Sequence, residues 1–467
     1  MFEPTVYKER RARLKQLLRG GVILLQGNND VPMNYPANPY TFRQDSTFLY
    51  FTGVNTTGFA LIMDLDTGED SLYGYDLEVD DIIWMGELPG LKEWARVAGI
   101  QHTRPYNQLS TDLQSIQHSN RKIHFLNPYR SDLKIELSGM LGIDIDDLGQ
   151  RASAELIKGI VALRSIKEDR EIAEMEAALH TTKHIYLRVI KNTLPGVKEQ
   201  ILTGIAEGIA IENGGHLAYP AIISRDGEIL HNHHHHHTLK DGDLVLADIG
   251  AEGPSGYASD ITRTFPVSCC FSERQRAIYQ IVLDAEMSCI EMLRPGITYL
   301  SVHLHAATII TEGLKELGIM RGDTDAAVKA GAHALFFPHG LGHMIGLDVH
   351  DMENLGEDYV GYSDSVQRSS QFGTAYLRLG RELEPGFVLT VEPGIYFIPA
   401  LIDLWKKENK HSGFINYEMV DQWRSFGGVR IEDNVLITED GHRVLGPAIP
   451  KTIEEIEALK TPPGRIS

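Results

Sequence analysis

The chain has 467 residues, of which 42% are hydrophobic and 23% charged, and its formal net charge at pH 7 is −20. This length predicts a globular protein of two domains. The acidic balance excludes a nucleic-acid partner and docking on anionic membranes, because both would need an excess of basic side chains.

The N-terminal part, residues 1–158, is predicted to form an α/β domain. Residues 1–21 indicate a polar amphipathic helix that ends at Gly20-Gly21, and this pattern differs from a signal peptide. Apolar strands follow and alternate with helical segments such as LPGLKEWARVAG; the strands are GVILLQG, FALIMDL and KIHFLNPY. Such alternation with short connections is typical of an α/β domain.

The C-terminal part, residues 159–467, is predicted to combine helices with short strands, so that the whole chain is α+β. Its start lies in a long charged helical region, residues 154–192, whose apolar residues recur at helical spacing. Further helices are expected at 272–293 and 302–318, and the tail TPPGRIS is expected to fray. No run of the sequence approaches the roughly 18 apolar residues of a membrane-spanning helix.

A histidine tract, HNHHHHHTLKDG, occupies residues 231–242. It lies mid-chain and is followed by turn residues and a coherent strand, so it is not a terminal purification tag. The pattern is typical of a solvated hairpin loop and favours that interpretation over a metal site.

The cysteines predict a reduced, cytoplasmic protein. The chain has three of them, two of which, Cys269 and Cys270, are adjacent. Three thiols cannot all pair, and no CxxC spacing is present, so we expect small core residues rather than nucleophiles.

Four acidic residues are embedded in predicted strands of the C-terminal part. Asp248 ends DLVLADIG, Asp260 begins SDITRTF and Glu392 interrupts VLTVEPGIY. In GVRIEDN, alternation places Glu432 on the same face as Arg430. An isolated carboxylate inside a β core costs several kcal/mol unless a cation or hydrogen-bond donors meet it. Two divalent cations would balance the four charges, and a set dominated by oxygen ligands suits Mn²⁺, with Co²⁺, Fe²⁺ or Zn²⁺ as alternatives.

The segment FPHGLGHMIGLDVHD, residues 337–351, is rich in histidine. In a helix, His339 and His343 would share one face. Gly340 and Gly342 make a helix unfavourable, so spacing alone does not name the ligand.

In chain order, LHNH, LADIGAE…ASDITRTFPV, HGLGHMIGLDVHD, TVEPGIYF and GVRIEDNVLIT resemble the motifs of the proline-specific metallopeptidases of the pita-bread fold, the prolidase and aminopeptidase P family. NPYTFRQDSTFLYFTGV resembles the N-terminal domain of that family, and FGGVRIEDNVLIT and IPKTIEEIEA look closest to prolidase. The resemblance implies an N-terminal α/β domain (1–158) and a pita-bread catalytic domain (159–467).

The resemblance implies two divalent metal ions per subunit and five ligands: Asp248, Asp260, His343, Glu392 and Glu432. Asp260 and Glu432 would bridge the ions. The stretch between Asp248 and Asp260 is one residue longer than the family pattern, and the turn signal Gly253–Gly256 is where the extra residue is expected.

It also implies roles for further side chains. His231 would donate to the scissile carbonyl and oxyanion, and His339 and His350 would support the ligands or contact substrate. Glu392 would also pass a proton to the proline nitrogen, and Arg430 would orient the site.

Two more residues are implied at the substrate end. Arg378 would bind the carboxylate of a dipeptide. Trp84 would reach the active site of the neighbouring subunit in a homodimer.

The expected activity is hydrolysis of the bond before proline in short peptides, by a hydroxide that two metal ions activate, with Xaa-Pro dipeptidase first. Aminopeptidase P, acting on longer Xaa-Pro peptides, is the alternative. A non-catalytic pita-bread binding module and metal-free creatinase are disfavoured because all five ligands are retained. The N-terminal domain disfavours methionine aminopeptidase.

Overall fold

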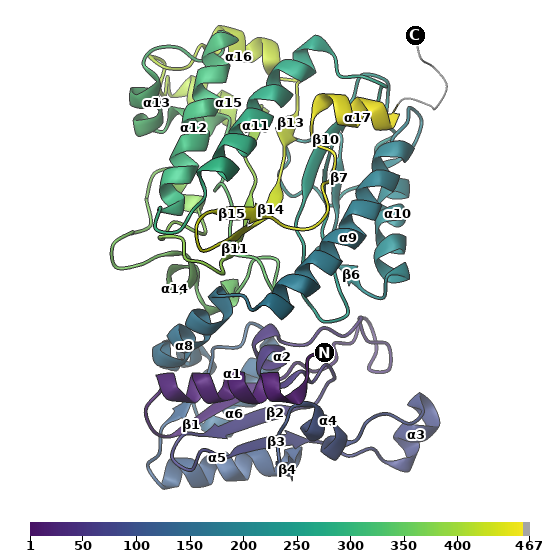
Figure 1. Ribbon diagram of the computed structural model, residues 1–467, viewed down its shortest axis with the longest axis vertical. Coiled ribbons are helices and arrows are strands. Elements are labelled where there is room, and N and C mark those ends of the chain that lie inside the picture. Colours follow the sequence, from purple (N-terminus) through teal and green to yellow (C-terminus); the bar gives the residue numbers. More distant parts are fainter. Residues whose placement is uncertain (461–467) are drawn as a thin grey trace. The chain divides into compact units, whose positions relative to one another are not determined.

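A computed structural model describes residues 1–460, and these form two compact units (Figure 1). The first unit contains Met1–Arg164 and Asn354–Tyr359; the second contains Ser165–Glu353 and the chain from Val360 onward. The boundary predicted at 158/159 falls within helix α8 (Ala154–Ser165). The tail 461–467, where fraying was predicted, lies outside the described residues.

The first unit is built on a five-stranded mixed sheet with strand order β4-β3-β2-β1-β5. The strands are β1 (Val22–Gln26), β2 (Ala60–Asp64), β3 (Asp70–Gly74), β4 (His102–Pro105) and β5 (Ile123–His124). The helices are α1 (Pro4–Leu17), α2 (Ser46–Thr52), α3 (Val79–Met85), α4 (Leu91–Val97), α5 (Leu109–His118), α6 (Ser131–Leu141), α7 (Leu148–Arg151) and α8. The predicted α/β alternation is present, although β5 is much shorter than the predicted strand KIHFLNPY.

The second unit combines long helices with several small sheets. Its helices are α9 (Asp169–Asn192), α10 (Glu199–Glu212), α11 (Glu273–Met292), α12 (Tyr299–Glu316), α13 (Thr324–Ala330), α15 (Pro399–Lys407), α16 (Tyr417–Trp423) and α17 (Ile453–Lys460); α14 (Glu357–Gly361) spans residues of both units. Its strands are β6 (His216–Leu217), β7 (Ile222–Ser224), β8 (Leu244–Asp248), β9 (Ala251–Glu252), β10 (Thr262–Pro266), β11 (Val388–Val391), β12 (Gly394–Tyr396), β13 (Gly428–Arg430), β14 (Asp433–Ile437) and β15 (His442–Val444).

Helix ends follow local capping chemistry. The Ser272 hydroxyl accepts the Gln275 N–H at the start of α11, and the Gln275 side chain accepts the Ser272 N–H at 2.9 Å. The helical region predicted at 154–192 is interrupted between α8 and α9, where the Glu171 carboxylate accepts the Glu168 N–H at 2.9 Å. The same apolar periodicity therefore spans two helices.

Strand pairing brings distant acidic residues together. In the antiparallel pair of β8 and β10, Asp248 lies opposite Thr262, and Thr262 in turn forms a β-bridge with Glu432. The turn at 253–256 closes with a 2.9 Å bond from the Gly256 N–H to the Gly253 carbonyl, with Gly256 at φ +86°. The segment where the extra residue is expected is therefore a turn that lies outside both β8 and β10.

One expectation about burial is wrong. Cys269 and Cys270 are exposed in the connection between β10 and α11, and only Cys289 is a core residue. Two adjacent residues in a surface connection have no sheet or helix face to bury them. In GVRIEDN the side chains on both faces are buried, Val429 and Ile431 on one face and Arg430 and Glu432 on the other.

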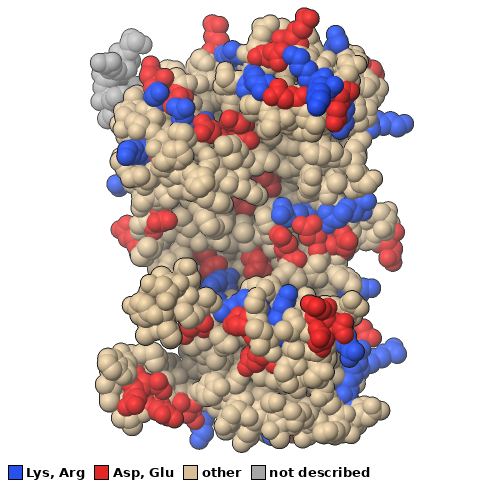
Figure 2. Space-filling view, turned by 180° about the vertical axis from the view of Figure 1, so that it is seen from behind, with Lys and Arg blue, Asp and Glu red and all other residues tan. Residues whose placement is uncertain are grey.

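No helix in the described part of the chain is long and apolar enough to cross a membrane. On the face shown in Figure 2, basic and acidic side chains are interspersed rather than gathered into one basic area.

Candidate metal centre

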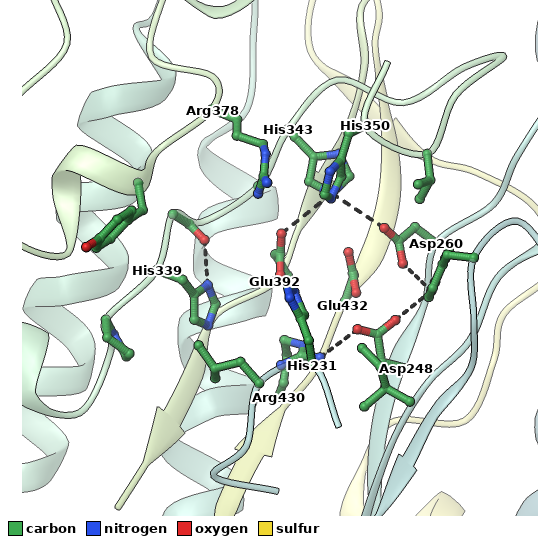
Figure 3. Close-up of a pocket in the computed structure, with 18 of the residues that line it drawn as sticks. His231, Asp248, Asp260, His339, His343, His350, Arg378, Glu392, Arg430 and Glu432 are labelled. Carbon is green, nitrogen blue, oxygen red and sulfur yellow. Dashed lines mark hydrogen bonds and ion pairs between the residues drawn. The ribbon is translucent and has the colours of Figure 1, made fainter. Parts of the chain in front are cut away.

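A cavity of about 610 Å³ in the second unit collects most of the candidate site residues (Figure 3). Those that line it are His231, Asp248, Asp260, His339, His343, His350, Arg378, Glu392, Arg430 and Glu432. Trp84 belongs to the first unit, on α3. The cavity also has an apolar wall: Pro220, Ile222, Leu230, Pro338, Val349, Phe372, Ile398 and Leu401.

Four carboxylates from separate segments point toward a common space, with the labelled histidines and arginines around it (Figure 3). The Tyr219 hydroxyl lies 2.5 Å from one carboxylate oxygen of Asp248 and 2.5 Å from one of Asp260. Burial and these carboxylates raise the pKa of Tyr219 well above its usual value. The phenol is therefore neutral and can donate its single proton to one carboxylate at a time.

His343 is oriented by its backbone. Its Nδ1–H donates to the Met344 carbonyl at 3.0 Å, so in the neutral ring Nε2 carries the lone pair. Nε2 lies 3.4 Å from Asp260 Oδ2 and 3.7 Å from Glu392 Oε1. Burial lowers the pKa of His343 to about 4. A neutral imidazole lone pair facing two carboxylates is the arrangement of a metal ligand.

The His343 segment lies irregularly alongside β11, and the predicted absence of a helix is confirmed. The Thr390 N–H donates to the His343 carbonyl at 3.0 Å, and the Glu392 N–H donates to the Leu341 carbonyl at 2.8 Å. A Cβ at Gly342 would stand 2.1 Å from the Thr390 carbonyl oxygen, so only glycine allows this approach.

The acidic residues fit a bound cation. Burial raises the pKa of Asp260, Glu392 and Glu432 well above the usual range, and the charges of neighbouring carboxylates raise each of them further. Glu432 Oε1 is buried without a hydrogen-bond partner among the described residues. One ligand atom each from Asp260, His343 and Glu432 lie within 4.8 Å of one another. A buried oxygen-rich set with one imidazole suits a divalent metal ion.

Arg430 connects the carboxylates to His339. Its Nη2 lies 2.6 Å from Asp248 Oδ2, and its Nη1 donates to the Tyr396 hydroxyl at 2.9 Å. His339 Nδ1–H donates to the Gly340 carbonyl at 2.7 Å, so Nε2 accepts from the Tyr396 hydroxyl at 2.9 Å. Burial lowers the pKa of His339 to about 3. Both ring nitrogens of His339 thus have protein partners.

His350 and Arg378 share one partner. His350 Nδ1–H donates to Glu353 Oε2 at 2.6 Å, and Arg378 Nε lies 3.4 Å from the same oxygen. The hydrogen bond from His350 lowers the pKa of Glu353 to about 2. Arg378 lines the cavity, whereas the nearby Arg381 pairs with Glu384 at 2.6 Å.

A buried cation network supports the segment that carries Glu432. The Arg263 guanidinium donates to five acceptors: the carbonyls of Thr262, Glu432, Ile449 and Pro450 and the carboxylate of Asp433. Asp433 also accepts from Lys451 at 2.6 Å. All five guanidinium donors are satisfied, and the backbone beside Glu432 is therefore held to β10.

Sequence reasoning missed several side chains that hold the candidate ligands. Tyr219, Tyr396 and Glu353 contact candidate residues through hydrogen bonds. The Thr262 hydroxyl donates to Glu432 at 2.7 Å. Of these residues, only Glu353 could have been predicted from the local sequence, because it lies three residues after its partner His350. The partners of the others are distant in the sequence.

The fold and the donor set define a metallohydrolase of the pita-bread class. Residues 173–439 match metallopeptidase family M24, and residues 7–124 match the N-terminal domain of aminopeptidase P. The chain belongs to family M24 and carries that N-terminal domain, which confirms the predicted family and fold class.

Individual relatives cover nearly the whole chain. The Xaa-Pro dipeptidase of Rattus norvegicus is 32% identical over 474 residues, which is 96% of this chain and 92% of that protein. A probable Xaa-Pro aminopeptidase of Verticillium alfalfae is 35% identical over 444 residues, 94% and 92% of the two chains. A zinc-substituted aminopeptidase P of E. coli in complex with product superposes with a TM-score of 0.80 at 30% identity, over 98% of both chains.

Proposed function

We propose that this protein is an Xaa-Pro dipeptidase. It is a proline-specific hydrolase of family M24, and the similarity to mammalian Xaa-Pro dipeptidases extends over 96% of the chain. The observation that supports a dipeptidase is Arg378, whose side chain lines the same cavity as the candidate metal ligands. A dipeptide places the free carboxylate directly after proline, where an arginine can bind it.

The proposed cofactor is a pair of divalent ions, Mn²⁺ first, held by Asp248, Asp260, His343, Glu392 and Glu432. When bound, the ions neutralise these carboxylates and acidify water for attack on the peptide carbonyl. His231 donates a hydrogen bond to the carbonyl oxygen as it gains negative charge. Glu392 carries a proton to the proline nitrogen.

The remaining residues position this machinery. Arg430 orients Asp248 through their 2.6 Å ion pair and His339 through Tyr396. His350 presents Nε2 to the substrate, because Glu353 engages Nδ1. The apolar wall of the cavity accommodates the proline ring and the side chain before it.

The test compares Ala-Pro with Ala-Pro-Ala on Mn²⁺-loaded protein, with products identified. Arg378→Ala should raise KM for Ala-Pro about 10- to 150-fold, the equivalent of the roughly 1.5–3 kcal/mol of a charged hydrogen bond. Ala-Pro-Ala, whose carboxylate lies one residue further out, should change much less. Arg381→Ala, the matched control in the same segment, should leave both values unchanged.

Aminopeptidase P is the second candidate, supported by the E. coli structures and the fungal relatives. It would replace the dipeptidase if the wild-type protein cleaves Ala-Pro-Ala faster than Ala-Pro and Arg378→Ala affects both alike.

A homodimer in the cytoplasm completes the proposal. Helix α3 buries none of its side chains, and Ile83 and Trp84 are 69% and 85% exposed. A second copy would cover this apolar surface, with Trp84 reaching the partner's active site. The cytoplasm is supported by the free cysteines, two of which are exposed.

Light scattering at micromolar concentration should give the mass of a dimer. Replacing both Ile83 and Trp84, as Ile83→Asp with Trp84→Ala, should yield a monomer. Ile135→Asp, an exposed position on α6, is the matched control and should remain dimeric. A monomeric wild-type protein would contradict this arrangement.

A further inference from the structure

A buried tyrosine hydroxyl joins the two segments that carry Asp248 and Asp260. The tyrosine is Tyr186, which lies on α9 and is fully buried. Its hydroxyl donates to the carbonyls of Ala247, 2.9 Å away, and Ile261, 2.5 Å away. In the sequence, Ala247 directly precedes Asp248 and Ile261 directly follows Asp260. One side chain from a helix therefore connects the backbones that carry two candidate ligands.

A second tyrosine makes the same arrangement at another pair of candidate ligands. Tyr299 is the first residue of α12 and is also fully buried. Its hydroxyl lies 2.5 Å from the Thr390 carbonyl and 3.3 Å from the Leu341 carbonyl. Thr390 precedes Glu392 by two residues, and Leu341 precedes His343 by two. Each of the two hydroxyls thus connects two segments, and each segment carries a different candidate ligand.

Both tyrosines are held in place by further bonds from their helices. The Tyr299 N–H donates to the Arg381 carbonyl at 3.0 Å where α12 begins. One turn before Tyr186 on α9, the Thr182 hydroxyl accepts the Ala251 N–H at 3.0 Å. Both phenols are neutral, because burial raises the pKa of each well above its usual value. Each hydroxyl therefore keeps its single proton, which the two carbonyls share.

The two tyrosines serve opposite ends of the carboxylate group. In Figure 3, His343 and Asp248 lie at opposite ends of this group, with Asp260 and Glu432 between them. One ligand atom each from Asp260, His343 and Glu432 lie within 4.8 Å of one another, a set that does not include Asp248. In the proposed pair of ions, bridged by Asp260 and Glu432, His343 and Asp248 therefore bind different ions.

We propose that Tyr186 and Tyr299 are positioning residues of the metal centre, each of which sets the separation of one pair of ligands. Tyr186 serves the two aspartates, and Tyr299 serves His343 and Glu392. This inference rests on the proposed function, because it takes the pair of ions from there. Groups that orient ligands contribute to metal affinity through the geometry that they maintain, and their loss typically weakens binding about 10- to 100-fold.

Mn²⁺ binding to the full chain tests the proposal. In equilibrium dialysis, Tyr186→Phe and Tyr299→Phe should each bind one of the two ions about 10- to 100-fold more weakly than the wild type. Tyr279→Phe is the matched control, since Tyr279 is equally buried and its hydroxyl donates to the Lys451 carbonyl at 2.7 Å, in a segment without candidate ligands. The control should keep its affinity for both ions. All three variants should melt about 2–4 °C lower than the wild type, because each loses a buried hydrogen bond.

Double variants separate positioning from a general loss of packing. In a His343→Ala background the ion that Tyr299 serves is already weakly bound, so Tyr299→Phe should lower Mn²⁺ affinity less than about twofold further. Tyr186→Phe should keep its full effect in that background. In an Asp248→Asn background the pattern should be reversed. Losses that simply add in both backgrounds would overturn the positioning role.

Activity gives a second readout. Saturating Mn²⁺ should restore kcat for Ala-Pro in both tyrosine variants to within a few-fold of the wild type, because neither hydroxyl lines the cavity. Unchanged Mn²⁺ affinity in either variant, or an equal loss of affinity in Tyr279→Phe, would overturn the proposal. A wild type that binds no Mn²⁺ would overturn it together with the metal centre. A wild type that binds two ions without hydrolysing Ala-Pro would contradict only the peptidase assignment, because the comparison of affinities does not depend on activity.

Discussion

Asp260→Asn is expected to lower kcat/KM for Ala-Pro at least about 10³-fold, because it removes an anionic oxygen from the candidate metal centre. Asp260 Oδ2 faces His343 Nε2 at 3.4 Å, and Oδ1 lies 2.5 Å from the Tyr219 hydroxyl. An asparagine of the same shape can still accept from Tyr219, so the backbone around it should remain in place.

Stability separates loss of metal from loss of fold. Burial and the charge of Asp248 raise the pKa of Asp260, so the charged carboxylate is unfavourable there without a cation. The metal-free Asp260→Asn variant should therefore melt no lower than the metal-free wild type. Binding of Mn²⁺ should raise the melting temperature of the wild type more than that of the variant.

Elemental analysis with and without chelator measures the bound metal, and thermal unfolding under the same two conditions measures the stability of the wild type and the variant. About two ions are expected per active wild-type chain, and chelation should stop hydrolysis. An active preparation that contains no metal would refute the proposed mechanism.

His231→Ala is expected to cost on the order of 10²-fold in kcat, the usual effect of losing one oxyanion donor. His231 lines the cavity, where burial and the Arg430 charge lower its pKa below the ordinary histidine value. At neutral pH the ring is therefore uncharged, with one N–H to donate. The loss should appear mainly in kcat, because the oxyanion forms only as the reaction proceeds.

The histidine tract supplies the matched control. Replacing His234–His237 by serine and glycine should leave kcat/KM of the metal-loaded protein within a few-fold, since only His231 and His233 of the tract line the cavity. Steady-state kinetics on both variants decide the matter. If both variants lost the same amount of activity, residues 234–237 would belong to the active site and the interpretation of this segment as a loop would be wrong.

Local sequence patterns predicted many of the elements that carry the site. The apolar run ending in Asp248 forms β8, and the glycine-rich segment around His343 remains irregular. Both follow from short-range chemistry, because side-chain periodicity and glycine's conformational freedom act within a few residues. Glu392, predicted in mid-strand, stands just after β11, since the following proline cannot continue the ladder.

The same local patterns misjudged positions whose burial depends on distant segments. Cys269 and Cys270 are small apolar residues by type, but no distant element covers them. Arg263 is charged by type, yet it is buried because five acceptors from β10, the Glu432 region and residues 449–450 converge on it. Residue type alone does not predict whether these side chains are exposed or buried, since burial depends on contacts with segments that are distant in the sequence.

The sequence by itself determined the family, the order of the motifs and the residue types able to bind a metal. Only the tertiary structure decided which atoms meet. His343 is distinguished from His339 by its Nε2, which faces Asp260, whereas His339 Nε2 is engaged by Tyr396. Likewise, Thr262 reaches Glu432 through a β-bridge between segments 170 residues apart. Hydrogen-bond partners of this kind depend on long-range pairing, which neither the spacing nor the periodicity of one segment specifies.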